Sequence, residues 1–402
     1  MLKLLMKVLF AACLFVRVVS PAYAEDGVQL HVPDNGLART PPMGWNSWNK
    51  FGCDIDEDKI RAVADALVAS GMKAAGYTYV VIDDCWQTGR DANGNIVADV
   101  VKFPSGIKAL GDYIHAKGLK FGIYSDTGIA TCQGRPGSRG YEYQDARTYA
   151  GWGVDYLKYD WCNTATQDAR SSYMLMGDAL AKSGRPILFS ICEWGKHDPW
   201  EWGRAVGGNM WRTTGDIWDN WEGEGNHGDW FGVLDILDRQ ANLYSHAGPG
   251  GWNDPDMLEV GNGGMTPDQY RAHFSLWAIL AAPLIAGNDL AHMDAGTLDI
   301  LTNHDVIAVD QDVLGVQGRR VYRNGDQEVW ARPLSDGGRA LVLLNRSKTA
   351  QTITAAWTDI GYPSQARLQV RDLWLHKEMG AFTGQYRVTV PAQSAVMIRL
   401  HT

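Results

Sequence analysis

The chain has 402 residues, of which 45% are hydrophobic and 21% charged, and its formal net charge is −9. This composition is typical of a globular protein with one large and one smaller domain. Because binding to phosphates needs cations, an acidic chain without a Lys/Arg cluster is a poor nucleic-acid ligand, and we expect no nucleic-acid partner.

The N-terminus has the pattern of a secretory signal peptide. Lys3 and Lys7 precede an apolar stretch, and Ala22-Tyr23-Ala24 fits a small-x-small cleavage site. We predict a signal peptide over residues 1–24, cleaved after Ala24, and a secreted or periplasmic protein. The segment carries three cations and no acids, so cleavage takes the net charge from −9 to −12. It is too short and too interrupted for a stable membrane span, and we expect none elsewhere.

From about residue 38 to 310, short apolar strands alternate with amphipathic helices, which indicates a parallel β/α architecture. The strand candidates are 41–46, 78–83, 119–125, 154–160, 186–193, 209–216, 248–254 and 283–289. Helix candidates lie at 59–76, 106–118, 171–184 and 266–283. Eight such units predict a (β/α)₈ barrel over residues 25–314, with a doubly wound sheet as the alternative. No G-x-G-x-x-G turn follows the first strand, so nucleotide binding gains no support.

After Gly315 the pattern changes to alternating apolar and polar residues punctuated by turn residues. Asn324-Gly325 lies between two such runs and is typical of a β-hairpin. We therefore predict a C-terminal antiparallel β-sandwich over residues 315–402.

Of the six cysteines, Cys13 lies in the signal peptide, and export makes disulfides plausible for the rest. The bridges Cys53–Cys85 and Cys132–Cys162 would each tie neighbouring loops, although sequence alone leaves the connectivity open. Cys192 would then be the free thiol. No C-x-x-C or Cys/His spacing suggests zinc, and we expect no metal and no cofactor.

Acidic and aromatic residues gather where the predicted strands end, and in a β/α barrel these ends form the active site. A single strand-end Asp is often a helix N-cap. Seven carboxylates interleaved with aromatics instead favour a ligand rich in hydroxyl donors, such as a sugar. The residues at these ends are Trp45, Asp83, Asp84, Tyr124, Lys158, Asp160, Glu193, Arg212, Asp216, Asp254 and Asp256.

Asp160 and Asp216 are the pair that we expect to carry out glycoside hydrolysis, which needs two carboxyl groups across the scissile bond. Lys158 leaves the same face of its strand as Asp160 and would favour its ionised form, which suits a nucleophile. Asp216 follows Arg212 at the rim, where a leaving group can depart.

Seven motifs together resemble the α-galactosidases of glycoside hydrolase family 27, from about Leu37 to the C-terminus. They are PPMGWNSW, IDDCW, GIYSD, LKYDWC, CEWG, WRTTGDI and GGWNDPDML. The resemblance implies a retaining α-galactosidase acting on galactose-containing carbohydrates, with Asp160 as nucleophile and Asp216 as acid/base. It implies galactose contacts from Trp45, Asp83, Asp84, Tyr124, Lys158, Arg212 and Asp256.

Within this resemblance, Asp83 and Asp84 would bind the 4-OH and 6-OH of galactose. Glu193 would fill the space that an N-acetyl group needs and hydrogen-bond a 2-OH instead. The two proposed disulfides also match family positions.

Several alternatives stay open at this point. Related retaining activities are β-L-arabinopyranosidase, α-galactosyl transferase and α-N-acetylgalactosaminidase. A non-catalytic galactose-binding protein would share the aromatics and acids, but it would need neither Lys158 nor a second carboxyl group. The sequence sets no oligomeric state and is compatible with a homo-oligomer.

Overall fold

The computed structural model describes residues 31–225 and 229–401. The predicted signal peptide, with its cleavage site and Cys13, lies outside the described residues. No helix in the described part of the chain has the length and apolar character needed to cross a membrane.

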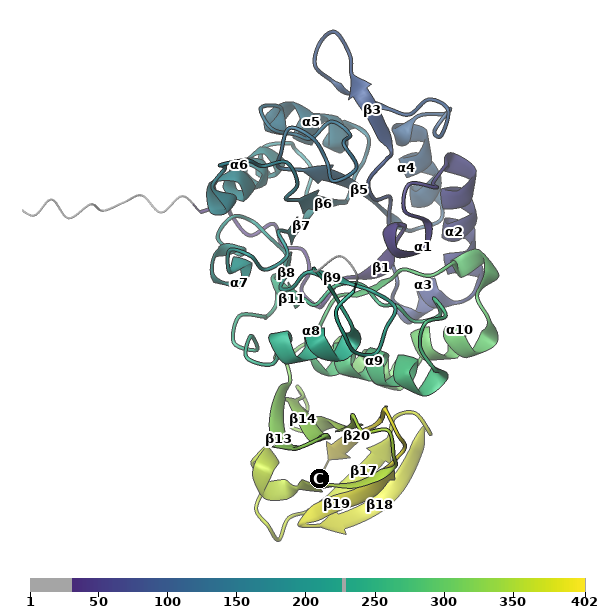
Figure 1. Ribbon diagram of the computed structural model, residues 1–402, viewed down its shortest axis with the longest axis vertical. Helices are drawn as coiled ribbons and strands as arrows, with labels where there is room; N and C mark the ends of the chain where they lie inside the picture. The colour runs from purple at the N-terminus through teal and green to yellow at the C-terminus, as the bar shows by residue number, and fades with distance from the viewer. Residues whose placement is uncertain (1–30, 226–228, 402) are drawn as a thin grey trace, which may run out of the picture. The chain divides into compact units, whose positions relative to one another are not determined.

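All eight predicted barrel strands are present, and they form one parallel sheet in the order β11-β8-β7-β6-β5-β2-β1-β12. Just beyond β11, the backbone N–H of Leu258 donates to the carbonyl of Ile285 on β12 at 2.8 Å, which links the two ends of the sheet. The sheet is therefore curled into the predicted (β/α)₈ barrel, and in Figure 1 its strands surround a common centre. The strands are β1 (Met43–Asn46), β2 (Tyr79–Val81), β5 (Lys120–Asp126), β6 (Tyr156–Asp160), β7 (Leu188–Cys192), β8 (Met210–Arg212), β11 (Trp252–Asp254) and β12 (Leu284–Ala286).

Helices lie outside these strands (Figure 1). The predicted helix over 59–76 is wrong in one respect: Gly71, at φ 89°, separates it into two helices. Four of the main helices, α5, α8, α10 and α11, were not predicted. The main helices are α2 (Glu57–Ala69), α3 (Met72–Ala75), α4 (Ile107–Ala116), α5 (Glu142–Gly151), α6 (Ala169–Ala181), α8 (Val233–Gln240), α9 (Pro267–Ile279), α10 (Ala295–Leu301) and α11 (His304–Asp310).

Shorter elements lie in the loops that connect the barrel strands to the main helices. They are α1 (Trp48–Phe51), the hairpin of β3 (Gln87–Arg90) and β4 (Ile96–Ala98), α7 (Pro199–Trp202), and the pair β9 (Asp216–Ile217) and β10 (Trp230–Phe231).

The C-terminal region is the predicted antiparallel β-sandwich. A six-stranded sheet has the order β13-β14-β15-β20-β17-β18, and β16 pairs with β19 in a second sheet. The expected hairpin at Asn324-Gly325 joins the first two strands, with Gly325 at φ 58°. The strands are β13 (Arg319–Asn324), β14 (Gln327–Pro333), β15 (Arg339–Asn345), β16 (Gln351–Ala356), β17 (Arg367–Asp372), β18 (Lys377–Thr383), β19 (Gln385–Val390) and β20 (Ser394–His401). The sequence did not reveal β18, because its residues are largely exposed and lack apolar alternation.

Helix α9 is the barrel helix that packs against the sandwich. Every residue from Ala272 to Ile279 is buried, and the helix packs against β14, β15 and β20. The buried guanidinium of Arg332 in β14 donates to the carbonyl of Ala278 at 2.9 Å. At the start of α9, the hydroxyl of Thr266 accepts a hydrogen bond from the backbone N–H of Gln269, and Oε1 of Gln269 accepts one from the backbone N–H of Thr266, which completes a capping box.

Replacing Thr266 by Ala should lower the free energy of unfolding by about 1 kcal/mol, because the first turn of α9 loses its side-chain acceptor. Thr266→Ser keeps the hydroxyl and serves as the control. Urea denaturation followed by tryptophan fluorescence measures both, and equal losses in the two variants would show that the cap is not what stabilises this end of α9.

Candidate active site

A cavity of about 600 Å³ lies at the carboxyl ends of the barrel strands. The structure brings eight of the ten predicted catalytic and sugar-binding residues to its wall. They are Asp83, Asp84, Tyr124, Lys158, Asp160, Arg212, Asp216 and Asp256.

Lys158 extends from β6 to the end of β2 and forms an ion pair with Asp83. Its Nζ lies 2.8 Å from Oδ2 of Asp83, and the same oxygen accepts a hydrogen bond from the amide of Asn46 at 2.8 Å. Burial is the largest single influence and opposes the charge on Lys158, but the ion pair with Asp83 and the nearby charge of Asp160 act together against it, and the pKa of Lys158 lies well above its usual value. Lys158 and Asp160 lie two residues apart on β6, as expected. The ion-pair partner of Lys158 is nevertheless Asp83, which follows β2.

Asp160 ends β6, and its carboxylate is held from two sides. Oδ2 accepts the hydroxyl of Tyr124 at 2.9 Å, and Oδ1 accepts the backbone N–H of Trp161 at 2.9 Å. Burial raises the pKa of Asp160 to about 6, the charge of Lys158 opposes this rise, and the charge of Asp216 adds to it. The hydrogen-bond donors and Lys158 stabilise the ionised form, so Asp160 can be a carboxylate near neutral pH in spite of its burial.

The second carboxyl group, Asp216, lies closer to solvent than Asp160. Its side chain is 36% exposed, while the Arg212 side chain that contacts it is 4% exposed. Nη2 of Arg212 lies 3.0 Å from Oδ1 of Asp216 and 2.8 Å from Oδ2 of Asp256. Asp256 also accepts the backbone N–H of Ile217 at 2.8 Å. Arg212 therefore holds the two acids of different loops in one cluster at the rim of the cavity.

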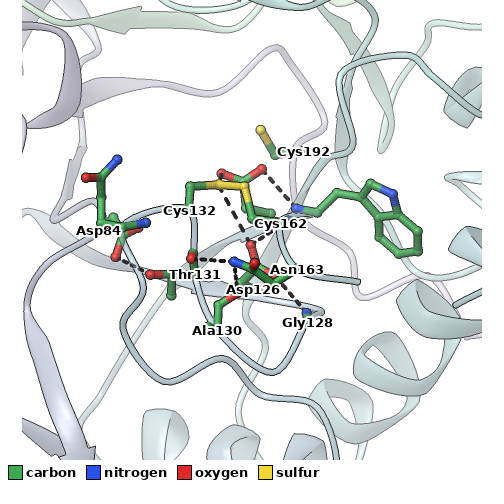
Figure 2. The surroundings of a disulfide bond; sticks show 12 residues. Asp84, Asp126, Gly128, Ala130, Thr131, Cys132, Cys162, Asn163 and Cys192 are labelled. Carbon is green, nitrogen blue, oxygen red and sulfur yellow. Dashed lines mark hydrogen bonds between the residues drawn. A yellow bond between two sulfur atoms is a disulfide. The ribbon is translucent and has the colours of Figure 1, made fainter. Parts of the chain in front are cut away.

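Both predicted disulfides are present, Cys53–Cys85 and Cys132–Cys162, and Cys192 is free and buried. Figure 2 shows the second bridge, with the sulfur of Cys192 apart from it. On either side of Cys132, the hydroxyl of Thr131 and the backbone N–H of Gln133 donate to Asp84 at 2.9 and 3.0 Å. The bridge thus fixes the loop that orients Asp84.

The other end of the same bridge is anchored beside the nucleophile candidate. Asp126, which is paired in register with Asp160 on the neighbouring strand, accepts the backbone N–H of Cys162 at 2.8 Å and that of Gly128 at 2.6 Å (Figure 2). Thr127 donates both its N–H and its hydroxyl to the carbonyl of Asp160 at 3.0 Å. Burial raises the pKa of Asp126 to about 9, and the charge of Asp160 adds to the shift. Asp126 therefore orders the loops around Asp160 from behind the cavity wall.

Two predicted sugar-contacting residues do not line the cavity. Trp45 is fully buried, and its indole N–H donates to the carbonyl of Asn288 at 2.8 Å. Glu193 turns toward His197, whose backbone N–H and ring Nδ1 lie 2.8 and 2.7 Å from Oε2. The side chain next to it, Trp194, lines the cavity instead.

Sequence reasoning missed a second group of lining residues. Trp218 follows Asp216 by two residues, which is the spacing that puts two side chains on the same face of an extended segment. Glu259 is buried among Asn49, Asn262 and acidic neighbours, and burial raises its pKa to about 8. The unusual number of Trp, 17 in the chain, was the one available signal for the aromatic part of this set. The set comprises Trp48, Asn49, Lys50, Phe51, Trp194, Trp218, Asp219, Trp230, Glu259 and Asn262.

The chain matches two family profiles in tandem. The profile for alpha galactosidase A matches residues 40–312, and the profile for the alpha galactosidase C-terminal beta sandwich domain matches residues 324–400. A protein of Cellvibrio japonicus named alpha-galactosidase A is 55% identical over 377 residues, which cover 90% of this chain and 92% of that protein.

Solved structures agree with these matches. The crystal structure of alpha-galactosidase I from Mortierella vinacea superimposes with a TM-score of 0.90 at 42% identity, over 92% of this chain and 98% of that one. The structure of the alpha-galactosidase from Saccharomyces cerevisiae with raffinose gives a TM-score of 0.88 at 31% identity, over 92% of this chain and 99% of that one.

The arrangement of cysteines predicts a simple thiol count. With a chromogenic thiol reagent, the native mature protein should show no reactive thiol, because Cys192 is buried and burial raises its pKa well above the usual value. Unfolding without reductant should expose one thiol, and unfolding with reductant should expose five. Three free thiols in the unreduced, unfolded protein would mean that one of the two bridges is absent.

Proposed function

The chain belongs to the alpha galactosidase A family, and from this premise we propose how its barrel mouth holds and cleaves the substrate. The protein is a glycoside hydrolase, a retaining α-galactosidase that removes terminal α-D-galactosyl residues from galactosides. The observation that carries the proposed residue roles is the pairing of a buried, hydrogen-bonded Asp160 with an Asp216 open to the cavity rim.

Asp160 is the nucleophile and Asp216 the acid/base. In the first step a carboxylate oxygen of Asp160 bonds to the anomeric carbon while Asp216 gives its proton to the departing glycosidic oxygen. In the second step Asp216 takes a proton from the attacking water, the bond to Asp160 breaks, and galactose leaves with its original anomeric configuration. The hydroxyl of Tyr124 and the N–H of Trp161 support this assignment, because they fix Asp160 before substrate arrives.

Asp83 and Asp84 select galactose by accepting hydrogen bonds from its 4-OH and 6-OH. Asn46 and Lys158 hold Asp83, and the loop of Cys132 holds Asp84, so neither acceptor needs to be reorganised on binding. Tyr124, Lys158, Arg212 and Asp256 line the same wall and complete the contacts to the sugar. Trp45 and Glu193 lie behind this wall and support it, with Trp194 facing the ligand.

The substrate class that we propose is a small α-galactoside of the raffinose type, because the yeast relative was solved with raffinose. We also propose that residues 1–24 are a signal peptide, that 25–314 form the catalytic barrel, and that 315–402 form the sandwich. Two disulfides support a secreted or periplasmic location, since they persist in oxidising compartments.

The decisive experiment is Asp160→Ala on p-nitrophenyl α-galactoside, with and without azide. We expect kcat to fall at least about a thousandfold, and azide to restore turnover with β-galactosyl azide as the product, since azide enters from the face that Asp160 vacates. The anomer is identified by NMR. Wild-type activity in this variant would refute the nucleophile assignment, and a wild type that binds galactose without turning over any α-galactoside would refute the enzymatic reading.

Asp216→Ala is the matched contrast. Its first step should remain fast for the activated nitrophenyl leaving group and become slow for melibiose, which needs protonation. Azide should now give α-galactosyl azide, because it attacks the covalent intermediate. The same β-anomer from both variants would contradict the division of roles.

The pH profile tests the electrostatics of Asp160. Because the carboxylate is the reactive form and its pKa is about 6, kcat/KM should fall as the pH drops through this value. Lys158→Met removes the charge that lowers the pKa of Asp160, so the acidic limb of the pH profile should move to higher pH by about one unit or more. Lys158→Arg keeps the charge and should leave the limb close to its original place. An unchanged limb in Lys158→Met would show that Asp160 does not control it.

A further inference from the structure

Away from the active site, three potential metal ligands converge where the barrel meets the sandwich. His304 and Asp305 begin α11, and His376 ends the turn between β17 and β18. We propose that these three side chains form a binding site for a divalent transition-metal ion of the zinc class.

The donor atoms are close enough to share one ion. Nδ1 of His376 lies 2.9 Å from Oδ2 of Asp305, and Nε2 of His304 lies 3.6 Å from Oδ1 of Asp305. One ligand atom from each of the three residues lies within 4.8 Å of the others. Zinc bonds of about 2.0–2.1 Å put neighbouring ligand atoms of a tetrahedral site roughly 3.3 Å apart. The two His–Asp spacings lie around this value. The rings of His304 and His376 are parallel, so the exposed imidazole of His304 has to rotate for both nitrogens to point at the ion.

The backbone segments that carry the ligands are already fastened together. Asn303, the residue before His304, donates from its side chain to the carbonyl of Leu373 at 3.1 Å. In the same turn, the indole N–H of Trp374 donates to the hydroxyl of Ser275 in α9 at 2.8 Å. His376 has the left-handed φ of 51°, which is unfavourable for a residue with a side chain and persists where surrounding contacts fix the backbone. Binding therefore requires little ordering of the backbone.

The chemistry of the three ligands suits zinc, copper(II) or nickel(II). Two imidazoles and one carboxylate are ligands that these ions prefer, whereas magnesium and calcium prefer oxygen alone. The His304 side chain is 79% exposed, which leaves an approach for the ion and room for a water molecule in the fourth position.

One neighbouring cation competes with the ion. Nη2 of Arg371 lies 2.8 Å from Oδ2 of Asp305, but Nη1 of the same side chain also lies 3.4 Å from Oε1 of Glu378. Arg371 can therefore remain paired with Glu378 while Asp305 turns Oδ1 to the metal. This competition predicts that Arg371→Gln tightens metal binding.

The other cluster with suitable spacing in the described part of the chain is Asp126, Cys132 and Cys162, beside the nucleophile. Its two cysteines are joined in a disulfide (Figure 2), so their sulfurs are not thiolates and the cluster is not a metal site.

Zinc chloride titrated into tag-free, EDTA-treated protein tests the proposal by isothermal calorimetry and native mass spectrometry. We expect one zinc ion per chain at His304, Asp305 and His376, and a higher midpoint of thermal unfolding, since the site exists only in the folded protein. His304→Ala and His376→Ala should each weaken binding at least about tenfold. Both side chains are partly or largely exposed, so neither variant should unfold the protein.

His292→Ala is the matched control, because His292 is an exposed histidine paired with a single carboxylate, Asp289, at 3.0 Å. It should bind zinc as the wild type does, and Arg371→Gln should bind it more tightly. The proposal is overturned if the wild type takes up no zinc at millimolar concentration, or if His304→Ala and His376→Ala bind it as well as His292→Ala does.

Discussion

Two buried cations hold the barrel mouth together. Seven carboxylates line the cavity, and such a concentration of negative charge is unfavourable without compensation. Lys158 on β6 pairs with Asp83 beyond the end of β2, with β5 between these two strands, and Arg212 joins Asp216 to Asp256. The remaining features of the site follow from how the acids that lack a cation of their own are satisfied.

Those acids are stabilised by neutral donors on tightly held loops. Asp160 accepts hydrogen bonds from the phenol of Tyr124 and the backbone N–H of Trp161. Asp84 accepts them from a hydroxyl and a backbone N–H on either side of Cys132. Backbone donors work only if their loops stay in place, which explains why a disulfide links the ends of β5 and β6 at this point. Fixed dipoles around Asp160 keep the carboxylate reactive, whereas a direct ion pair would neutralise the charge of the proposed nucleophile.

The sequence predicted all eight barrel strands and the acidic part of the cavity wall, because both rest on local rules: apolar runs form strands, and barrel sites lie at strand ends. It missed much of the aromatic part of the wall, which comes from loops beyond the strand ends. The errors arise where local rules stop. Glu193 was expected to contact the sugar because it lies at a strand end and matches a family position, but β7 ends at Cys192 and Trp194 adopts a φ of 58°, so position at the strand end does not decide which side chain faces the cavity. The partner of Lys158, Asp83, follows another strand, and His304 and His376 of the proposed metal site are far apart in the chain, so neither pairing is visible as a sequence spacing.

The sandwich contributes to the site through α9, although the cavity lies in the barrel. Because α9 is buried almost all round, the barrel alone would expose an apolar helix, and the two parts are expected to fold as one. From α9, the indole N–H of Trp277 donates to the carbonyl of Asp256 at 2.7 Å. Asp256 has an unfavourable φ of 82°, which persists only where surrounding contacts fix it. Since Asp256 in turn pairs with Arg212 beside Asp216, the packing of the sandwich on α9 stabilises the position of the proposed acid/base.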